Sequence, residues 1–324
     1  MIRNKINLHL HIDGSLRPST VYEIARRENI KPECDMSLEE IEKEMIIQPG
    51  TYDPDFLCFN PPIRIMQSSY ALARVTKELV EDLDKEDIKY AELRFAPQYH
   101  LEKGLTQDEV VKAVCTGLND GLKENPSIIC GVILCAMDLG EANMNHEANI
   151  ETINVAKKYL GKGVVGVDLA GYESDLENFK DLFDLARSLG IPTTCHSEFT
   201  VEQAIKFNTN RIGHGYEFGL KKELADLAVK TGITLEMCPV SSVKYDYGLR
   251  IDETHPLRVL YKAGAKVTVN TDNNTVLLTS LEEEYKCMRK MGFSDNEIED
   301  VNRNAIRAAF TDNETKRKLL ALTD

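Results

Sequence analysis

The stretch Ile128-Ile129-Cys130-Gly131-Val132-Ile133-Leu134-Cys135 is almost continuously apolar and rich in β-branched residues. An alternating pattern would indicate a strand with one face in water, but this run has no polar face. Strands of this kind are typical of parallel sheets whose outer surface is covered by helices. The stretch therefore predicts an α/β fold.

Seven more short β-rich runs occur along the chain, separated by stretches with helical periodicity. The eight predicted strands cover residues 5–12, 88–95, 128–136, 164–170, 192–197, 211–214, 233–238 and 266–271. Strands that alternate with helices pair in parallel, and eight such units close into a barrel. We therefore predict a (β/α)8 TIM barrel.

Capping boxes, in which Ser or Thr is followed three residues later by Glu, mark five predicted helix starts. They are Thr20 with Glu23, Ser37 with Glu40, Thr106 with Glu109, Ser280 with Glu283, and Ser294 with Glu297.

The segment 13–87 is too long for a single crossover between two strands. We expect it to carry extra helices between strand one and strand two, lying over the barrel mouth. Asp53-Pro54 and Pro61-Pro62 divide the segment into pieces. Phe56, Leu57 and Phe59 are candidates to line an apolar subsite there, and ordinary core packing is the alternative.

The composition is that of an ordinary globular protein, with 42% hydrophobic and 28% charged residues. No low-complexity linker divides the 324 residues, so we expect a single barrel domain over residues 1–324. The formal net charge of −14 repels polyanions, which argues against nucleic acid and anionic membranes as partners. A small-molecule ligand is the expected partner, while the oligomeric state is not indicated.

Neither a leader peptide nor a membrane-spanning run is visible, so we expect a cytoplasmic protein. Eight cysteines are scattered without C-x-x-C pairs, as is usual for reduced thiols.

Polar residues with metal-binding or acid–base chemistry gather where predicted strands end, which is where a barrel of this kind builds its active site. Alternate residues of a strand share a face, so His9 and His11 can hold one cation; two half-buried histidines that bond backbone carbonyls are the alternative. The remaining residues at strand ends are His196, Glu198, His214, Asp272 and Asn273.

Three imidazoles and a carboxylate form a sound ligand set for zinc or a related divalent ion, with one position left for water. The predicted ligands are His9, His11, His196 and Asp272. We expect one Zn²⁺ per chain, with another divalent metal as the alternative. An ion held in this way activates water, so the predicted reaction is a hydrolysis.

Six motifs follow one another between residue 5 and about residue 310. They are His9-x-His11-x-Asp13-Gly14-Ser15-Leu16, Glu92-Leu93-Arg94-Phe95-Ala96-Pro97, Val165-Gly166-Val167-Asp168-Leu169-Ala170-Gly171, Arg211-Ile212-Gly213-His214-Gly215, Cys238-Pro239-x-Ser241 and Asn270-Thr271-Asp272. In this order and spacing, the chain resembles the adenosine deaminases of the metal-dependent amidohydrolase superfamily. The resemblance implies zinc-dependent deamination of an adenosine or 2′-deoxyadenosine-like nucleoside to the 6-oxo product and ammonia.

The resemblance also implies roles for individual residues. His214 matches the histidine that orients the attacking water, and Asp272 and His11 serve the reaction and the substrate besides holding the metal. Asp13 matches the carboxylate that binds the ribose 5′-hydroxyl, and Gly171 matches the glycine whose backbone contacts purine N3. Related deaminases of free adenine carry Glu where Asp13 stands, so Asp13 favours a nucleoside substrate.

Two residues depart from the family pattern, and both lie in the predicted site. Glu198, the expected proton donor to purine N1, follows His196 by two residues, whereas the family glutamate follows by three. Either the acid is retained by a shortened loop, which we favour, or it is displaced and the chemistry altered. Asn273 stands where the family has a second aspartate; its amide could bind purine N7 without a protonation step, select a changed base, or cap a loop.

Two alternatives to adenosine deamination follow from these departures. One is a catalytically impaired family member that binds a nucleoside. The other is a deaminase of a different aminopurine or heterocycle.

Overall fold

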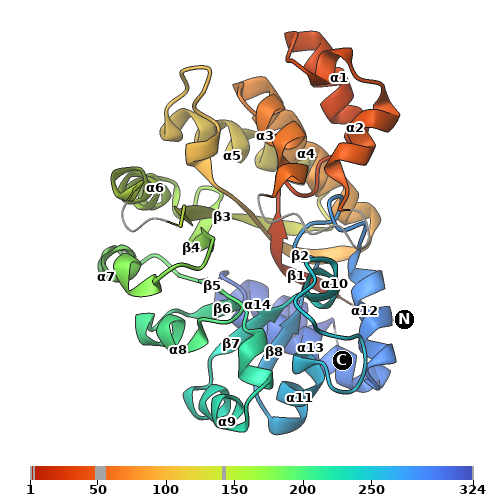
Figure 1. The fold of residues 1–324 in the computed structure, drawn as a ribbon, viewed down its shortest axis with the longest axis vertical. Helices are drawn as coiled ribbons and strands as arrows, with labels where there is room; N and C mark the ends of the chain where they lie inside the picture. Colours follow the sequence, from red (N-terminus) through yellow and green to blue (C-terminus); the bar gives the residue numbers. More distant parts are fainter. Residues whose placement is uncertain (1, 3, 48–55, 141–143, 323–324) are drawn as a thin grey trace.

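Eight parallel strands alternate with helices and surround one central region (Figure 1). The computed structural model describes residues 2, 4–47, 56–140 and 144–322. One sheet has the order β1 (Lys5–His11), β2 (Ile88–Phe95), β3 (Ile129–Asp138), β4 (Val164–Gly171). The other has the order β5 (His196–Ser197), β6 (Arg211–His214), β7 (Thr234–Met237), β8 (Lys266–Val269).

Isolated parallel bridges join the two sheets at both seams. Leu10 pairs with Asp272 just beyond β8, and Val167 in β4 pairs with Thr193 just before β5. The eight strands thus follow one another around a barrel, and the predicted (β/α)8 fold is confirmed. β5 is shorter than the predicted 192–197 because Pro192 has no N–H for a ladder and Thr193 pairs only through its bridge.

The alternation of side chains between the two faces of β1 determines where its histidines point. Ile6 and Leu8 at even positions pack with Ile306 of α13 (Asp295–Ala308), outside the barrel. Asn7 at an odd position donates to the Thr271 hydroxyl at 2.8 Å, beside the end of β8. His9 shares this inward face because strand side chains alternate.

In the described part of the segment between β1 and β2, four α-helices are present, as expected from its length. They are α1 (Pro18–Glu28), α2 (Leu38–Met45), α3 (Asn60–Ile65) and α4 (Ser69–Lys85). Pro61 and Pro62 lie in the first turn of α3, where proline is tolerated because its missing N–H would have no helical partner. The predicted break at Asp53-Pro54 lies outside the described residues.

The remaining helices follow the later strands, and α5, α6, α7 and α9 lie on the outside of the molecule (Figure 1). They are α5 (Gln107–Glu124), α6 (His146–Tyr159), α7 (Lys180–Ser188), α8 (Val201–Ala204), α9 (Lys222–Thr231), α10 (Pro239–Lys244), α11 (Pro256–Ala263), α12 (Leu281–Lys290), α13 and α14 (Asn313–Ala321). Short 3-10 helices cover Glu33–Asp35, Leu57–Phe59, Pro97–Tyr99, Leu176–Phe179, Ile205–Phe207 and Tyr216–Gly219.

Four of the five predicted helix starts are confirmed: Ser37, Thr106, Ser280 and Ser294 each accept a hydrogen bond from the backbone N–H three residues later. The reciprocal glutamate contact that completes a capping box is present at Ser37, Thr106 and Ser294. The prediction at Thr20 is wrong. Helix α1 begins at Pro18 after Arg17, because the fixed φ of proline suits a first helical position. Thr20 lies in the first turn instead, and its hydroxyl donates to Glu78 in α4.

Within the described ranges, no helix is both long and apolar enough to cross a bilayer. That residues 1–324 form a single domain stays a prediction.

Candidate active site

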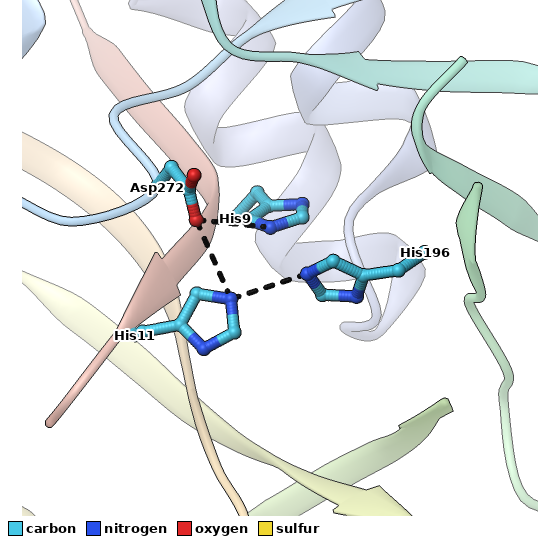
Figure 2. A group of neighbouring side chains, drawn as sticks. All are labelled: His9, His11, His196 and Asp272. Atoms are coloured by element: carbon cyan, nitrogen blue, oxygen red, sulfur yellow. Dashed lines mark hydrogen bonds and ion pairs between the residues drawn. The ribbon is translucent and has the colours of Figure 1, made fainter. Parts of the chain in front are cut away.

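Four of the predicted site residues form a compact cluster at the C-terminal ends of the strands (Figure 2). His9 and His11 come from β1, His196 comes from β5, and Asp272 follows β8. One potential ligand atom from each lies within 4.8 Å of the others. His11 Nε2 lies 3.2 Å from His196 Nε2 and 3.4 Å from Asp272 Oδ1. The geometry allows all four side chains to share one ion.

Carboxylates behind the cluster orient two of its imidazoles. His9 Nδ1 lies 2.9 Å from Glu236 Oε2 in β7, and His196 Nδ1 lies 2.9 Å from Asp168 Oδ2 in β4. The His9 contact is a hydrogen bond and the His196 contact is an ion-pair distance. In both residues the carboxylate faces Nδ1 and Nε2 faces the cluster, an arrangement typical of metal-binding histidines. The buried His9 Nε2 has no hydrogen-bond partner among the described residues.

An unpartnered buried nitrogen is costly unless something else binds it. Together with the three-histidine, one-carboxylate donor set, His9 Nε2 shows that these residues fit a divalent ion such as zinc.

Arg94 in β2 holds both orienting carboxylates in place. Its guanidinium donates to Asp168 at 2.7 Å and to Glu236 at 2.8 Å. Burial by itself raises the pKa of Glu236, but Arg94 and Arg211 beside it hold that pKa well below its ordinary value. Glu236 thus stays ionised and can accept a hydrogen bond from the N–H of His9 Nδ1.

A cavity of about 480 Å³ opens over the cluster. This volume suits a small organic ligand. Its wall includes all the predicted site residues except His9, which is fully buried behind it: His11, Asp13, Gly171, His196, Glu198, His214, Asp272 and Asn273.

Aromatic side chains form much of the outer wall of the cavity. Phe56 and Phe59 line it, together with Tyr172 and Tyr245, whose rings lie 6.3 Å and 5.8 Å from that of Phe56. Leu57, in contrast, is 58% exposed and does not line the cavity. The structure therefore places two of the three candidates for an apolar subsite in the wall.

Glu198 points into the same cavity. Its Oε1 lies 3.3 Å from His214 Nε2, at the end of β6. The Tyr216 hydroxyl donates to the Cys238 carbonyl at 2.7 Å, so His214 Nδ1, 3.1 Å from the same hydroxyl oxygen, acts as the donor in that contact. Burial lowers the pKa of His214 well below its ordinary value. In neutral His214, Nε2 is then an acceptor, and a hydrogen bond to Glu198 requires the proton to come from the Glu198 carboxyl group.

The loops after β1 and β8 approach each other closely, as do the ends of β3 and β4. A Cβ at Gly14 would overlap the Asn273 side chain, and a Cβ at Gly171 would overlap the Asp138 carbonyl. Gly171 also has φ of +130°, a conformation open only to glycine. Its backbone is therefore left accessible in the wall.

His214 and Asp272 adopt left-handed φ values of 60° and 62°. Such strain in non-glycine residues is concentrated at functional sites. Ser241 of α10 donates to Asp272 Oδ2 at 2.7 Å, which leaves Oδ1 toward His9 and His11.

Comparison with known proteins agrees with this geometry. Residues 4–324 match the family model described as "Adenosine deaminase". The chain belongs to the adenosine deaminase family. This metal-dependent family includes the adenosine deaminase of Clostridium kluyveri, 40% identical over 97% of this chain and 92% of the relative. It also includes that of Haemophilus ducreyi, 34% identical over 98% and 94%.

Solved structures of the family have the same fold. The Arabidopsis N6-mAMP deaminase superimposes with a TM-score of 0.85 at 26% identity, covering 99% of this chain and 98% of the other. An Arabidopsis ADAL structure complexed with GMP gives the same TM-score and identity over 99% and 96%. The protein is thus an adenosine deaminase-like aminohydrolase.

Several residues that support the family's site are missed by the sequence predictions. Asp168 and Glu236 lie inside strands, whereas the sequence predictions considered only residues at strand ends. Arg94 and Tyr216 were not predicted as site residues either. A signal was present in Val167-Asp168-Leu169 and Leu235-Glu236-Met237, where a carboxylate interrupts an apolar strand. A charge at such a position needs a buried partner.

Proposed function

We propose that this protein is a zinc-dependent enzyme that hydrolytically deaminates a 6-aminopurine nucleoside, adenosine or a 2′-deoxyadenosine-like compound, to the 6-oxo product and ammonia. The observation that carries the proposal is the shared cavity: the metal-binding cluster and the Glu198–His214 pair face the same space. The curated adenosine deaminases of similar sequence and the GMP complex of the Arabidopsis neighbour support a purine ligand.

The proposed metal ligands are His9, His11, His196 and Asp272, with one Zn²⁺ per chain. When bound, zinc would supply an activated water at neutral pH and electrostatic stabilisation of the developing charge. Glu236 and Asp168 would keep the Nε2 atoms of His9 and His196 free for the ion.

His214 is proposed to orient the attacking water, with Nδ1 engaged by Tyr216 and Nε2 facing the cavity, 3.3 Å from Glu198 Oε1. Asp272, next to it, would accept a hydrogen bond from the same water through an oxygen that Ser241 does not use. Glu198 is proposed to hold the proton that passes to purine N1, because its Oε1 lies 3.3 Å from His214 Nε2, which in neutral His214 can only accept a hydrogen bond while Nδ1 donates to Tyr216.

The remaining wall residues are proposed to bind the nucleoside. Asp13 is 6% exposed, and its Oδ1, which lies 4.0 Å from His11 Nδ1, has no hydrogen-bond partner among the described residues, so it can accept a hydrogen bond from the 5′-hydroxyl. The backbone of Gly171 would contact purine N3, and the side-chain amide N–H of Asn273 would donate a hydrogen bond to N7 without a protonation step. His11 lines the cavity beside Asp13 and would contact the substrate as well as the ion.

A substrate panel with metal analysis tests the proposal. Ammonia release should be measured for adenosine, 2′-deoxyadenosine, adenine, 5′-modified adenosines and other aminopurines, alongside the metal content of the purified protein. We expect about one zinc per chain and turnover of adenosine or 2′-deoxyadenosine. Preference for another base would instead favour a deaminase of a different heterocycle, and tight nucleoside binding without ammonia would favour an impaired family member.

Two variants separate metal binding from acid catalysis. His196→Asn should lose both zinc and ammonia release, whereas His146→Asn, a histidine that pairs with Asp181 at 2.6 Å away from the site, should keep both. Glu198→Gln should keep zinc and lower kcat by about 10²- to 10⁴-fold, the range for loss of a general acid. Near-normal turnover by Glu198→Gln would remove Glu198 from the mechanism.

A further inference from the structure

The turn after β5 is tied to a carboxylate from the loop after β4. Glu173 accepts a hydrogen bond from the backbone N–H of Glu198 through Oε1. Its other oxygen, Oε2, accepts from the backbone N–H of Phe199 at 3.3 Å and from the Thr200 hydroxyl at 3.0 Å. One side chain thus binds three consecutive residues of the turn that carries Glu198.

Glu173 is itself held in place. Its φ of +49° is an unusual left-handed conformation for a non-glycine residue. The loop around it is anchored to the end of β3, where the Asp138 carboxylate accepts from the Ser174 N–H at 2.6 Å and the Asp138 carbonyl accepts from the Tyr172 N–H at 3.1 Å. The carboxylate therefore approaches the turn from a fixed position.

The turn is also held on its other side, at the end of β6. The Glu198 carbonyl accepts from the Glu217 N–H at 2.9 Å, and the Ser197 carbonyl accepts from the Gly215 N–H at 2.9 Å. With Glu173 on one side and the β6 end on the other, both peptide groups of Glu198 are fixed. The side chain then points into the cavity, where its Oε1 meets His214.

We propose that Glu173 is a positioning residue that clamps the turn at residues 198–200 so that Glu198, two residues after His196, delivers its carboxyl group to the cavity. This inference rests on the proposed function, because it assigns Glu173 a part in the reaction only through Glu198. The clamp explains physically how an acid that follows His196 by two residues, instead of the family's three, can still reach the site.

A double-mutant cycle with a structural readout tests the clamp. The variants are Glu173→Gln, Glu198→Gln, the double variant, and Glu177→Gln as the matched control. Glu177 lies in the 3-10 helix Leu176–Phe179, a few residues after Glu173. Its side chain is exposed and accepts a hydrogen bond from Lys206 at 2.8 Å instead of from the turn. For each variant, kcat and KM for adenosine, zinc content, and hydrogen–deuterium exchange of the 194–204 segment are measured.

Glu173→Gln keeps one acceptor but places an amide N–H₂ against a donor of the turn. We expect kcat to fall by about 10- to 100-fold, as for a misplaced catalytic group, with KM and zinc content unchanged. The amides of Glu198 and Phe199 should exchange faster than in the parent. In the Glu198→Gln background, Glu173→Gln should lower kcat no further, because its effect passes through the acid.

Each contrary result has a distinct meaning. Unchanged exchange at residues 198 and 199, a kcat within twofold of the parent, or additive losses in the double variant would each overturn the clamp. Full activity of Glu198→Gln would overturn the acid assignment of the proposed function, while the exchange result would still report on the hydrogen bonds. If Glu173→Gln does not fold, Thr200→Val removes only one donor of the clamp and should lower kcat several-fold, and no loss in that variant would overturn the proposal.

Discussion

Asp13 and Asp272 are both buried carboxyl groups, but their surroundings shift their protonation in opposite directions. Burial raises the pKa of Asp13 to about 7, and the amides of its own loop offset only part of that effect. Burial also acts to raise the pKa of Asp272, but the imidazoles of His9 and His214 close to it hold that pKa below its ordinary value. A carboxyl group among imidazoles suits an ion site, while one with a free oxygen suits a hydroxyl-bearing ligand.

Replacement of Asp13 by Ala should impair only substrates with a 5′-hydroxyl. At a pH above 7 the Asp13 carboxyl group is mostly ionised. A hydrogen bond to an ionised group is worth about 1.5–3 kcal/mol, so kcat/KM for adenosine should then fall about 10- to 100-fold. The value for 5′-deoxyadenosine should stay nearly constant, because that compound lacks the hydroxyl. Steady-state kinetics on the two substrates checks this expectation, and equal losses on both would show that Asp13 serves another purpose.

At the scale of elements, helices α4 and α5 approach each other closely at Gly117. A Cβ at this position would overlap the carbonyl group of Ala73 in α4. Helix propensity alone favours Ala over Gly by about 1 kcal/mol. At Gly117 the steric overlap outweighs this preference, because the Ala73 carbonyl group can move away only if helix α4 moves with it.

We therefore expect Gly117→Ala to lower the free energy of unfolding, by about 1–3 kcal/mol, the range for an overpacked contact. Urea denaturation measures the change. Thr116→Ala, at the adjacent exposed position of α5, is the control and should be neutral or slightly stabilising. A stabilised Gly117→Ala would mean that the two helices separate easily.

Helix α12 supports the site wall through a buried acid. Glu284 accepts from the Val240 N–H of α10 at 3.0 Å and from the Thr279 hydroxyl at 2.9 Å. Burial raises its pKa from the ordinary 4.5 to about 8, and the charge of Asp272 adds to the shift. The folded protein thus binds this proton more tightly than the unfolded chain does.

This group should make the protein less stable as pH rises. Its contribution is fully present below about pH 4.5 and is lost progressively as pH rises to 8, by up to about 1.4 kcal/mol per pH unit. Glu284→Gln cannot ionise, so its stability relative to the parent should increase between pH 5 and pH 8. Urea unfolding of both proteins at several pH values measures the difference, and parallel pH profiles would contradict the prediction.

At the scale of the whole molecule, a buried ionic network connects the two sheets. Arg211 in β6 donates to Glu236 in β7 at 2.5 Å, to Glu92 in β2, and to the Ala308 carbonyl of α13 at 2.8 Å. Glu236 also bonds Arg94 and His9. The network therefore extends from helix α13, through the barrel interior, to His9 in the cluster of three histidines and Asp272.

Arg211→Met should be strongly destabilising. Removal of one partner leaves Glu92 and Glu236 buried with less compensation, a loss of about 3–5 kcal/mol for a buried pair. Metal affinity should also fall, by about 10- to 100-fold, because Glu236 orients His9. Denaturant unfolding and zinc titration measure the two effects. Arg250→Met, which removes an arginine that is 82% exposed, is the control and should change neither.

The sequence by itself predicted the barrel and the four residues that the structure brings together in a cluster able to hold a metal ion. Apolar runs and helical periodicity are local signals, set by neighbours two to four residues away, and they locate the strands to within a few residues at most ends. Strand ends then identify His9, His11, His196 and Asp272. Thr20 shows the limit of such signals, because its sequence fits a capping box but helix α1 begins two residues earlier, at Pro18.

Only the tertiary structure decided where Glu198 points and what supports the cluster. From its offset alone, Glu198 was either retained or displaced, and the choice depends on contacts to Glu173, 25 residues earlier, and to the end of β6. His9 likewise depends on Glu236, 227 residues away. The physical reason is that such contacts follow from the register and closure of the barrel, which bring distant strands together and have no local pattern.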